Sequence, residues 1–367
     1  MFKYLVCSLL IILISCSSNK VCRNPDGEEV DWYTIFFMPS SASSNNKIYY
    51  GYYDPTLEDL EYYEYSEDTF PPNFITKYAK GKGKDFNYFF WNDDKTLKNS
   101  KSESASSTKA HAKGSLVYDN DNGAFLLHSL PRFPTRNVNN DILTELPSNG
   151  GSYGQTFLCI SLDKKNSEQI AKLLNCVNVS INKSVKTDRV NNSPNRWINA
   201  LINNKMDCTC SIQHTVKIKS KGNEVFTFYG KNYKNKIIPY DTTLRQVYGD
   251  DFYVRTWSRP SLAPSLYESK NLVNVLEVKF GIYTYGVNKE HSKWGISKNK
   301  NIVCFSDLNH TESQKERGGQ IVCFENKILH KIMTYAIVST DDDNLYSSKN
   351  DNDHLVELLK RKINQSQ

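Results

Sequence analysis

The sequence predicts an α/β (α+β) fold that is rich in β-sheet and built from two similar halves. Aromatic residues make up 12% of the 367 residues, and short apolar runs recur along the chain. Such runs are typical of β-strands. The tripeptide His-x-Lys also occurs twice, at 111–113 and 291–293, and each copy precedes a strand-like run that ends in polar residues. The length allows one large domain or two smaller ones, each with a buried core.

The first half, residues 22–175, is predicted to contain a buried strand, a hairpin and a helix. In chain order these are Asp31 to Pro39, Ser115 to Leu127 with a turn at 119–123, and Ser167 to Asn175. The hairpin follows the first His-x-Lys directly, so His128 is expected at the end of a strand that runs back past His111.

The second half, residues 207–345, is predicted to repeat this plan. Strand-like runs precede and follow the second His-x-Lys, at Val275 to Tyr285, Gly295 to Ser297, Ile302 to Phe305 and Gly318 to Phe324. An Asn-rich segment, 176–206, is expected to connect the halves. A charged tail at 346–367 is expected to be peripheral.

The N-terminus indicates export. Residues 1–18 combine Lys3, an apolar run from Tyr4 to Ile14 and small residues, which is typical of a secretory signal peptide. A bacterial lipoprotein signal is the alternative, because Leu13 to Cys16 fits that pattern. No later stretch is apolar enough to span a membrane, so no stable membrane association is expected. An oxidising compartment would then favour disulfides among the cysteines that follow the signal.

The net charge, two of the cysteines and the sequons bear on the expected partner, on metal binding and on glycosylation. The formal net charge of +6 suits a polyanionic partner without requiring one. Cys208 and Cys210 lack partners at zinc-like spacing, so no metal site is expected. Sequons at Asn178, Asn182 and Asn191 cluster as in a glycosylated surface loop, and others start at Asn309 and Asn364.

The repeated tripeptide indicates phosphate chemistry. On a strand, residues two apart project to the same face, so His111 lies beside Lys113 and His291 beside Lys293. Two such strands related by a pseudo-twofold axis would surround one point with two imidazoles and two ammonium groups. Lysines hold anionic oxygens, one histidine attacks phosphorus, and the other protonates the leaving oxygen.

Further blocks extend this pattern over most of the chain. They are Val30 to Tyr33, His111 to Gly114, His128 to Pro134, Tyr153 to Cys159, Asp251 to Val254, His291 to Trp294, Asp307 to Asn309 and Glu316 to Gly319. In order and spacing the chain resembles the deoxyribonuclease II family from about residue 22 to about residue 345. The resemblance implies a phospholipase D-like pseudodimer, in which two mixed β-sheet halves flanked by helices surround one central site.

The resemblance also implies roles for individual residues. His111, Lys113, His291 and Lys293 are the expected catalytic set, and His128, Asp307 and Asn309 are expected to orient a histidine or contact phosphate. Arg317 either completes this set or ties down its own loop. The implied disulfides are Cys22–Cys159 and Cys304–Cys323, which leaves Cys176, Cys208 and Cys210 without an even pairing.

The implied activity is metal-independent and cofactor-independent acid cleavage of DNA through a phosphohistidine, giving 3′-phosphate and 5′-hydroxyl ends in a lysosomal or secreted enzyme. Analogy with phospholipase D favours His111 as the nucleophile. The ordinary pKa of histidine, about 6.5, suits an acidic medium.

Two other functions stay open. One is a secreted, catalytically inactive nucleic-acid-binding or interaction protein. The other is a lipid phosphodiesterase, which is disfavoured because Tyr118 and Lys298 stand where His-x-Lys-x4-Asp has its aspartate. The sequence also leaves a homodimer open.

Overall fold

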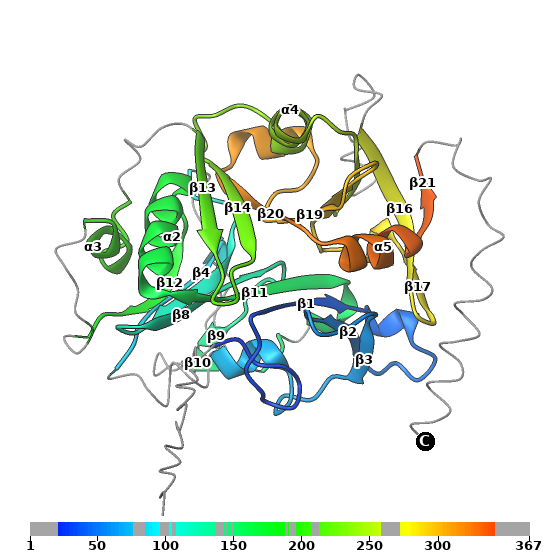
Figure 1. The fold of residues 1–367 in the computed structure, drawn as a ribbon, viewed down its shortest axis with the longest axis horizontal. Helices are drawn as coiled ribbons and strands as arrows, with labels where there is room; N and C mark the ends of the chain where they lie inside the picture. Colours follow the sequence, from blue (N-terminus) through cyan, green and yellow to red (C-terminus); the bar gives the residue numbers. More distant parts are fainter. Residues whose placement is uncertain are drawn as a thin grey trace, which may run out of the picture.

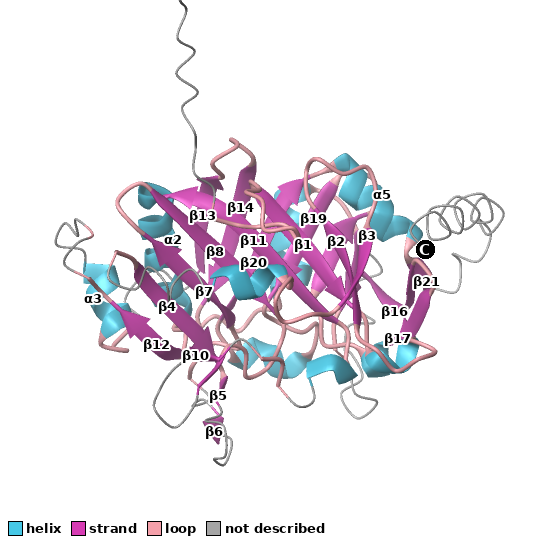
Figure 2. Ribbon diagram, turned by 90° about the horizontal axis from the view of Figure 1, so that it is seen from below, coloured by secondary structure: helices cyan, strands magenta, loops and turns pink. Residues whose placement is uncertain are grey.

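The computed structural model describes residues 21–75, 85–95, 103–104, 108–136, 142–143, 145–147, 150–187, 190, 196–206, 213–257 and 272–341. The predicted signal peptide, the tail at 346–367, the sequons at Asn191 and Asn364, and Cys208 and Cys210 lie outside these ranges. Within them the chain forms two large sheets with few helices, as the composition predicts (Figure 2).

The first sheet contains eight strands in the spatial order β12-β4-β7-β8-β11-β1-β2-β3. Their bounds are β1 Trp32–Phe37, β2 Tyr49–Tyr53, β3 Glu61–Glu64, β4 Asn87–Asn92, β7 Lys113–Tyr118, β8 Asn122–His128, β11 Gln155–Asp163 and β12 Ile181–Val185. The predicted hairpin is β7 and β8, and every residue of the predicted first strand that lies in β1 is buried.

The second sheet contains nine strands, in the order β13-β14-β20-β19-β18-β15-β16-β17, with β21 paired to β16. They are β13 Gln213–Lys219, β14 Val225–Lys231, β15 Phe252–Arg255, β16 Leu272–Phe280, β17 Tyr283–Gly286, β18 Trp294–Ser297, β19 Ile302–Ser306, β20 Gly319–Glu325 and β21 Ile337–Thr340. Strands β18 and β19 form the second predicted hairpin, and β15 pairs with β16 in parallel.

Shorter elements connect and cover the sheets. Two small hairpins pair β5 (Asp94–Lys95) with β6 (Glu103–Ser104) and β9 (Thr135–Arg136) with β10 (Ile142–Leu143). The helices are α2 Lys164–Val177, α3 Arg196–Ile202, α4 Arg245–Tyr248 and α5 Lys327–Tyr335, and the short turns are η1 Ser40–Ala42, η2 Gly150–Ser152, η3 Tyr240–Leu244, η5 Val287–Lys289 and η6 Glu312–Glu316.

Helix α2 shows why the predicted helix forms. The side chain of Asp163 accepts a hydrogen bond from the Asn166 amide and caps the N-terminus, and Asn178 ends the helix in a left-handed conformation. Its buried residues, Ile170, Ala171, Leu173, Leu174 and Val177, recur at helical spacing. This apolar face packs against strands of both sheets, beside β13 and β14 (Figure 1).

The main core lies between the two sheets. Alternate residues of β1 face it, so Trp32 packs on Phe324 with ring centroids 4.8 Å apart, and Phe36 stacks on Phe280 at 4.7 Å. Tyr33 and the other odd-numbered residues of β1 face a second cluster on the outer side of the first sheet. The second sheet has its own outer cluster. The two sheets, which pack against each other in Figure 1, therefore have one apolar layer between them and one on each outer side.

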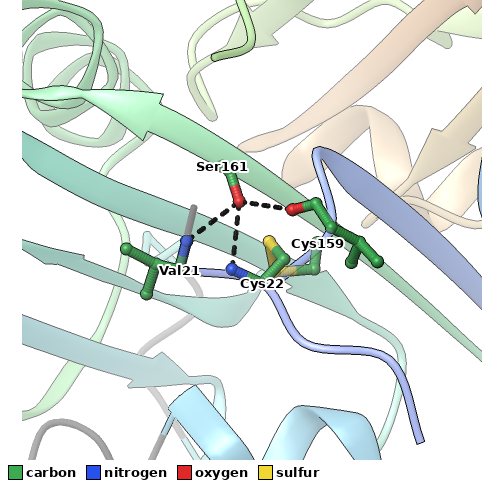
Figure 3. Close-up of a disulfide and its surroundings, with 5 residues drawn as sticks. Val21, Cys22, Cys159 and Ser161 are labelled. Carbon is green, nitrogen blue, oxygen red and sulfur yellow. Dashed lines mark hydrogen bonds between the residues drawn. A yellow bond between two sulfur atoms is a disulfide. The ribbon is translucent and has the colours of Figure 1, made fainter. Parts of the chain in front are cut away.

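Each outer layer contains one of the implied disulfides. Cys22–Cys159 joins the chain before β1 to β11, and Cys304–Cys323 joins β19 to β20. Beside the first, Ser161 Oγ accepts hydrogen bonds from the amides of Val21 and Cys22 (Figure 3). Both implied pairings are confirmed. Cys176 is also disulfide-bonded.

The Asn-rich segment contains more structure than a connection requires. It contributes β12 to the edge of the first sheet and α3, which packs on α2. The expectation of an exposed, glycosylated loop is wrong at Asn178, which is 7% exposed. Asn178 is the left-handed C-cap residue of α2. Its side chain donates to the Thr108 carbonyl and accepts from Lys109 Nζ.

Candidate functional site

The two His-x-Lys segments enter equivalent strands of the two sheets. His111 lies two residues before β7 begins at Lys113, and His291 lies three residues before β18 begins at Trp294. The backbone amide of each histidine donates across to the other half. The His111 amide donates to the Gly318 carbonyl at 2.9 Å, and the His291 amide donates to the Gly154 carbonyl at 2.9 Å. The two halves are therefore joined at the two histidines.

Each imidazole is also held at Nδ1 by the opposite half. His111 Nδ1 lies 2.8 Å from Gln314 Oε1, in η6. His291 Nδ1 lies 2.8 Å from the Ser129 carbonyl oxygen, which follows β8. A carbonyl can only accept, so Nδ1 of His291 carries the proton, and Nε2 of the neutral ring keeps a lone pair. Gln314 could not be predicted from the sequence, because its partner His111 is 203 residues away along the chain.

Asp93 is a site residue that sequence analysis did not single out. It immediately follows β4, and the pairing of Asn92 with Lys113 brings it beside the first His-x-Lys. Its carboxylate forms an ion pair with Lys113 Nζ and lies 3.6 Å from His111 Nε2. A strand-like run followed by Asn92 and two aspartates was the available signal, the same signal that pointed to His128.

Arg317 joins this group rather than its own loop alone. Its Nη2 lies 3.2 Å from Asp93 Oδ2, and its Nε donates to the Lys109 carbonyl at 3.1 Å. Both partners belong to the first half. A second-half guanidinium therefore balances the first-half carboxylate next to His111.

Lys293 and Asp307 lie deeper than the histidines. Lys293 is 1% exposed, and its Nζ donates to the His291 carbonyl at 2.7 Å. Asp307 is 3% exposed, and its Oδ1 accepts from the Lys113 amide at 3.3 Å. The other carboxylate oxygen of Asp307 and the amide oxygen of Asn309 are buried and have no hydrogen-bond partner among the described residues. The two histidines are part-exposed, and the charges of Lys113 and Lys293 act on both of them.

His128 has an apolar environment. Its ring stacks on Phe157 at 5.6 Å between centroids and meets Phe133 edge-on at 5.4 Å. Within the described part of the chain, neither ring nitrogen has a hydrogen-bond partner of normal geometry. Burial lowers its pKa to about 3, and the nearby Lys113 charge adds to the effect. Its predicted role in orienting His111 has no direct contact behind it and stays a prediction.

Burial and the two lysines set the charge states. Burial lowers the pKa of His111 to about 3, opposed by Asp93 and assisted by Lys113 and Lys293. Burial, then Lys293 and Lys113, lower the pKa of His291 well below its ordinary value. The ordinary pKa assumed from the sequence therefore does not apply to the free site.

The same forces act on the other buried groups of the site. Burial and the charge of Lys113 lower the pKa of Lys293 to about 7. Burial raises the pKa of Asp307 to about 8. Burial would also raise the pKa of Asp93, but Lys113 and His111 outweigh it and hold that pKa below its ordinary value. The site is thus a largely buried group of side chains with an excess of positive charge, which would favour an anion.

A buried ion pair supports the second histidine. Glu290 Oε1 accepts the backbone amides of His291 and Ser292, at 3.1 and 2.9 Å. Its other oxygen pairs with Arg255 Nε, and both side chains are fully buried. Arg255 also donates to the carbonyl oxygens of Val275 and Tyr285. This network fixes the turn from which His291 projects.

Comparison with known proteins shows to which family the chain belongs. The family model described as Deoxyribonuclease II matches residues 21–342. The chain belongs to the deoxyribonuclease II family. It is therefore a nuclease of the deoxyribonuclease II type, a phosphodiester hydrolase, and its two-sheet α+β architecture fits the phospholipase D-like fold.

Relatives match along most of the chain. Cell-death-related nuclease 7 of Caenorhabditis elegans is 23% identical over 359 residues, or 92% of each chain. Plancitoxin-1 of Acanthaster planci is 26% identical over 350 residues, covering 90% of this chain and 95% of its own. Deoxyribonuclease-2-alpha of Bos taurus is 24% identical over 324 residues, covering 82% and 85%.

The described residues show neither a metal-binding cluster nor a membrane-spanning helix. No group of three or more His, Cys, Asp or Glu side chains in these ranges is placed to hold a metal ion. Across the same ranges, none of the helices has the length and apolar character needed to cross a membrane.

Proposed function

We propose that this deoxyribonuclease II family member is a metal-independent acid endonuclease that hydrolyses DNA phosphodiesters through a phosphohistidine, leaving 3′-phosphate and 5′-hydroxyl ends. The observation that carries the proposal is that each imidazole is held at Nδ1 by the opposite half and lies near enough to the other His-x-Lys segment to be affected by the charge of its lysine. This arrangement leaves Nε2 of each ring for chemistry. Catalytic geometry of this kind supplies a nucleophile and a proton donor at one phosphorus.

The reaction takes place in two displacements. One neutral imidazole attacks phosphorus, and the bond from phosphorus to the 5′ oxygen breaks. The second, protonated imidazole gives its proton to that oxygen. Water then attacks the phosphohistidine, and the 3′-phosphate leaves. Lys113 and Lys293 hold the non-bridging oxygens as point charges, since the ammonium group of Lys113 lies on Asp93 and that of Lys293 lies on the His291 carbonyl.

The charges around the site favour acidic medium. The proton-donating histidine must be charged, and burial lowers the pKa of both histidines. Lys293 loses charge as the pH rises through about 7, which weakens its hold on phosphate. A bound phosphodiester, being an anion, raises the pKa of every neighbouring cation and so retains their protons. Activity should therefore rise as the pH falls from neutrality, until the attacking histidine is itself protonated.

DNA is the proposed substrate, and a lysosome or the exterior is the proposed location. The net charge of +6 supports a polyanion, and relatives carry the name deoxyribonuclease. Two disulfides in the described chain support passage through an oxidising compartment.

The test is plasmid cleavage at pH 5 with excess EDTA. We expect the wild type to nick plasmid, and His111→Ala and His291→Ala each to lose activity by at least about a hundredfold. His214→Ala, on the edge strand β13, is the matched control and should keep activity. Failure of a folded wild type to cleave would overturn the proposal and favour a binding protein, and turnover of phosphatidylcholine in place of plasmid would favour a lipid phosphodiesterase.

A further inference from the structure

Strands β7 and β18 follow the two His-x-Lys segments, and each pairs with one further strand, β4 or β15. These two partner strands carry different residues at equivalent positions. In the first sheet, β4 places Trp91 opposite Gly114, the residue after Lys113. In the second sheet, β15 places Arg255 opposite Trp294, the residue after Lys293. The pseudo-twofold relation between the sheets therefore matches Trp91 with Arg255. Two residues further along each strand direction are Asp93 and Trp257, which are matched in the same way.

These matched residues face the two histidines. The Asp93 carboxylate lies 3.6 Å from Nε2 of His111, beyond hydrogen-bond distance but close enough to stabilise a positive charge. The Trp257 ring lies 5.4 Å from the His291 ring between centroids, tilted by 41°. An anion thus stands beside one imidazole, and an apolar ring stands beside the other.

The remaining charges do not remove this difference. Lys113 and Lys293 act on both histidines, and Arg317 adds its charge at His111. Asp93 opposes these cations at His111 by raising its pKa. The carboxylate next to His291, Glu290, is instead neutralised by the buried Arg255.

The hydrogen-bond partners of the two rings also favour protonation of His111 over His291. Nε2 of His291 carries a lone pair, because Nδ1 donates to a carbonyl oxygen. At His111 both ring nitrogens face oxygen, Gln314 Oε1 at Nδ1 and the Asp93 carboxylate at Nε2. Two oxygen neighbours favour a doubly protonated ring. Where two like groups have environments that favour different protonation states, the acid and the base of a reaction can be assigned.

We propose that Asp93 is a positioning residue that makes the two histidines unequal, so that His111 is the proton donor and His291 is the nucleophile. The inference rests on the proposed two-histidine mechanism and reverses the expectation that His111 attacks. In the first step the His291 Nε2 lone pair forms the bond to phosphorus, the bond to the 5′ oxygen breaks, and that oxygen takes the Nε2 proton of His111. In the second step neutral His111 takes a proton from water, whose oxygen displaces His291.

An activated ester separates the two roles. In thymidine 3′-(p-nitrophenyl phosphate), nitrophenolate replaces the 5′ oxygen and departs without a proton. We expect His111→Ala to release a burst of nitrophenolate equal to the enzyme present, because attack by His291 needs no acid. The intermediate should then accumulate, since water lacks its base. His291→Ala should give no burst.

The phosphorylated residue is identified by mass spectrometry after an alkaline quench, which preserves phosphohistidine. Phosphate on His291 supports the assignment. Phosphate on His111, or a burst from His291→Ala but not from His111→Ala, overturns it while leaving the two-histidine mechanism intact. Absence of any phosphohistidine from wild type and both variants overturns the mechanism and the assignment together.

Asp93→Asn tests the positioning role with a side chain of the same size. We expect plasmid cleavage at pH 5 to fall about tenfold to a hundredfold, and the decline of activity with rising pH to begin about one pH unit lower, because His111 has lost an anion. Turnover of the nitrophenyl ester should change less than about threefold. The neighbouring Asp94→Asn, which loses a surface ion pair with Arg132, is the control and should alter neither profile. Equal losses on both substrates with an unmoved pH profile would reduce Asp93 to a structural role.

Discussion

A single buried carboxyl group, Asp307, connects the site to stability. Its Oδ1 accepts an amide hydrogen bond, and its Oδ2 has no partner in the described structure. Burial raises its pKa to about 8, although Lys113 and Lys293 act in the opposite direction. At pH 5 the side chain is therefore neutral and can donate a hydrogen bond to a substrate oxygen. At neutral pH the folded protein still binds a proton that the unfolded chain has released.

Asp307→Asn should remove this pH dependence. The pKa of an aspartate in the unfolded chain is about 3.9. Because the pKa of Asp307 is higher in the folded state, the free energy of unfolding falls as the pH rises from the unfolded-state pKa toward the folded-state pKa. We expect the variant to match wild type at pH 4 and to exceed its unfolding free energy at pH 7 by a few kcal/mol, on the order of 1.4 per pKa unit. Urea unfolding at the two pH values measures this. The exposed Asp121→Asn is the control, and parallel pH curves for wild type and Asp307→Asn would contradict the prediction.

The sequence could point to the four His and Lys residues of the repeated tripeptides as candidate site residues, because they stand at fixed spacing from their own strands. It could not predict Asp93 or Gln314, whose place depends on which strand ends meet. Asp93 reaches His111 through the register of β4 on β7, and Gln314 reaches it from the other sheet. Register of this kind is fixed by side-chain packing over many residues rather than by local spacing.

At the scale of elements, two glycines let the halves approach. A Cβ at Gly318 would lie 2.2 Å from the Val177 carbonyl oxygen, and one at Gly154 would lie 2.7 Å from the Tyr285 ring. These are the residues whose carbonyls accept from His111 and His291. Only a residue without a side chain permits this contact.

Gly318→Ala should therefore disturb the site more than the addition of one methyl group usually does. The new methyl group would meet backbone, which cannot rotate away, so the His111 amide should lose its acceptor. We expect cleavage to fall at least about tenfold with the circular dichroism spectrum retained. Gly286→Ala is the matched control, because its methyl group would meet a side-chain oxygen at 3.3 Å. A folded Gly318→Ala enzyme of full activity would show that the close approach is dispensable.

The Arg255–Glu290 pair gives a second prediction at this scale. Arg255→Met would leave the Glu290 carboxylate buried and without its cation, which typically costs about 3–5 kcal/mol. The double variant with Glu290→Gln should recover part of this loss. Urea unfolding measures both. Lys47→Ala, which breaks the exposed pair with Glu64, is the control and should change little. Equal effects of Arg255→Met and Lys47→Ala would refute the argument.

Elements were predicted where periodicity is strong and missed where it is weak. The hairpin and α2 follow from their own sequences, but β12 has a mainly polar sequence and becomes a strand by pairing with β4. Tertiary pairing overrides local preference in such edge strands. The Asn-rich composition therefore indicated a connection where the chain forms a sheet edge.

At the scale of the whole molecule, the disulfides differ in what they constrain. The cysteines of Cys22–Cys159 are 137 residues apart in the sequence, and those of Cys304–Cys323 are 19 residues apart. Loop-closure entropy makes a cross-link over the longer loop more stabilising, about 5 kcal/mol against about 3 kcal/mol at 25 °C. The first also secures the chain before β1 to the middle of its sheet.

Removing each bridge should reveal this order. We expect Cys22→Ala with Cys159→Ala to lower the urea midpoint more than Cys304→Ala with Cys323→Ala does, since the longer loop gains more freedom on unfolding. Denaturation curves at pH 5 measure both double variants against wild type. A larger loss from the shorter loop would mean that packing around β19 and β20, and not chain entropy, dominates.

The contrast between Asp93 and Trp257 has a consequence for assembly. Two identical subunits around a twofold axis must present the same neighbour to both of their histidines, so the division of labour could arise only when a substrate broke the symmetry. A single chain with two unlike halves is free of that constraint. The scissile strand would then meet an enzyme with a built-in direction, and would bind in one polarity rather than two.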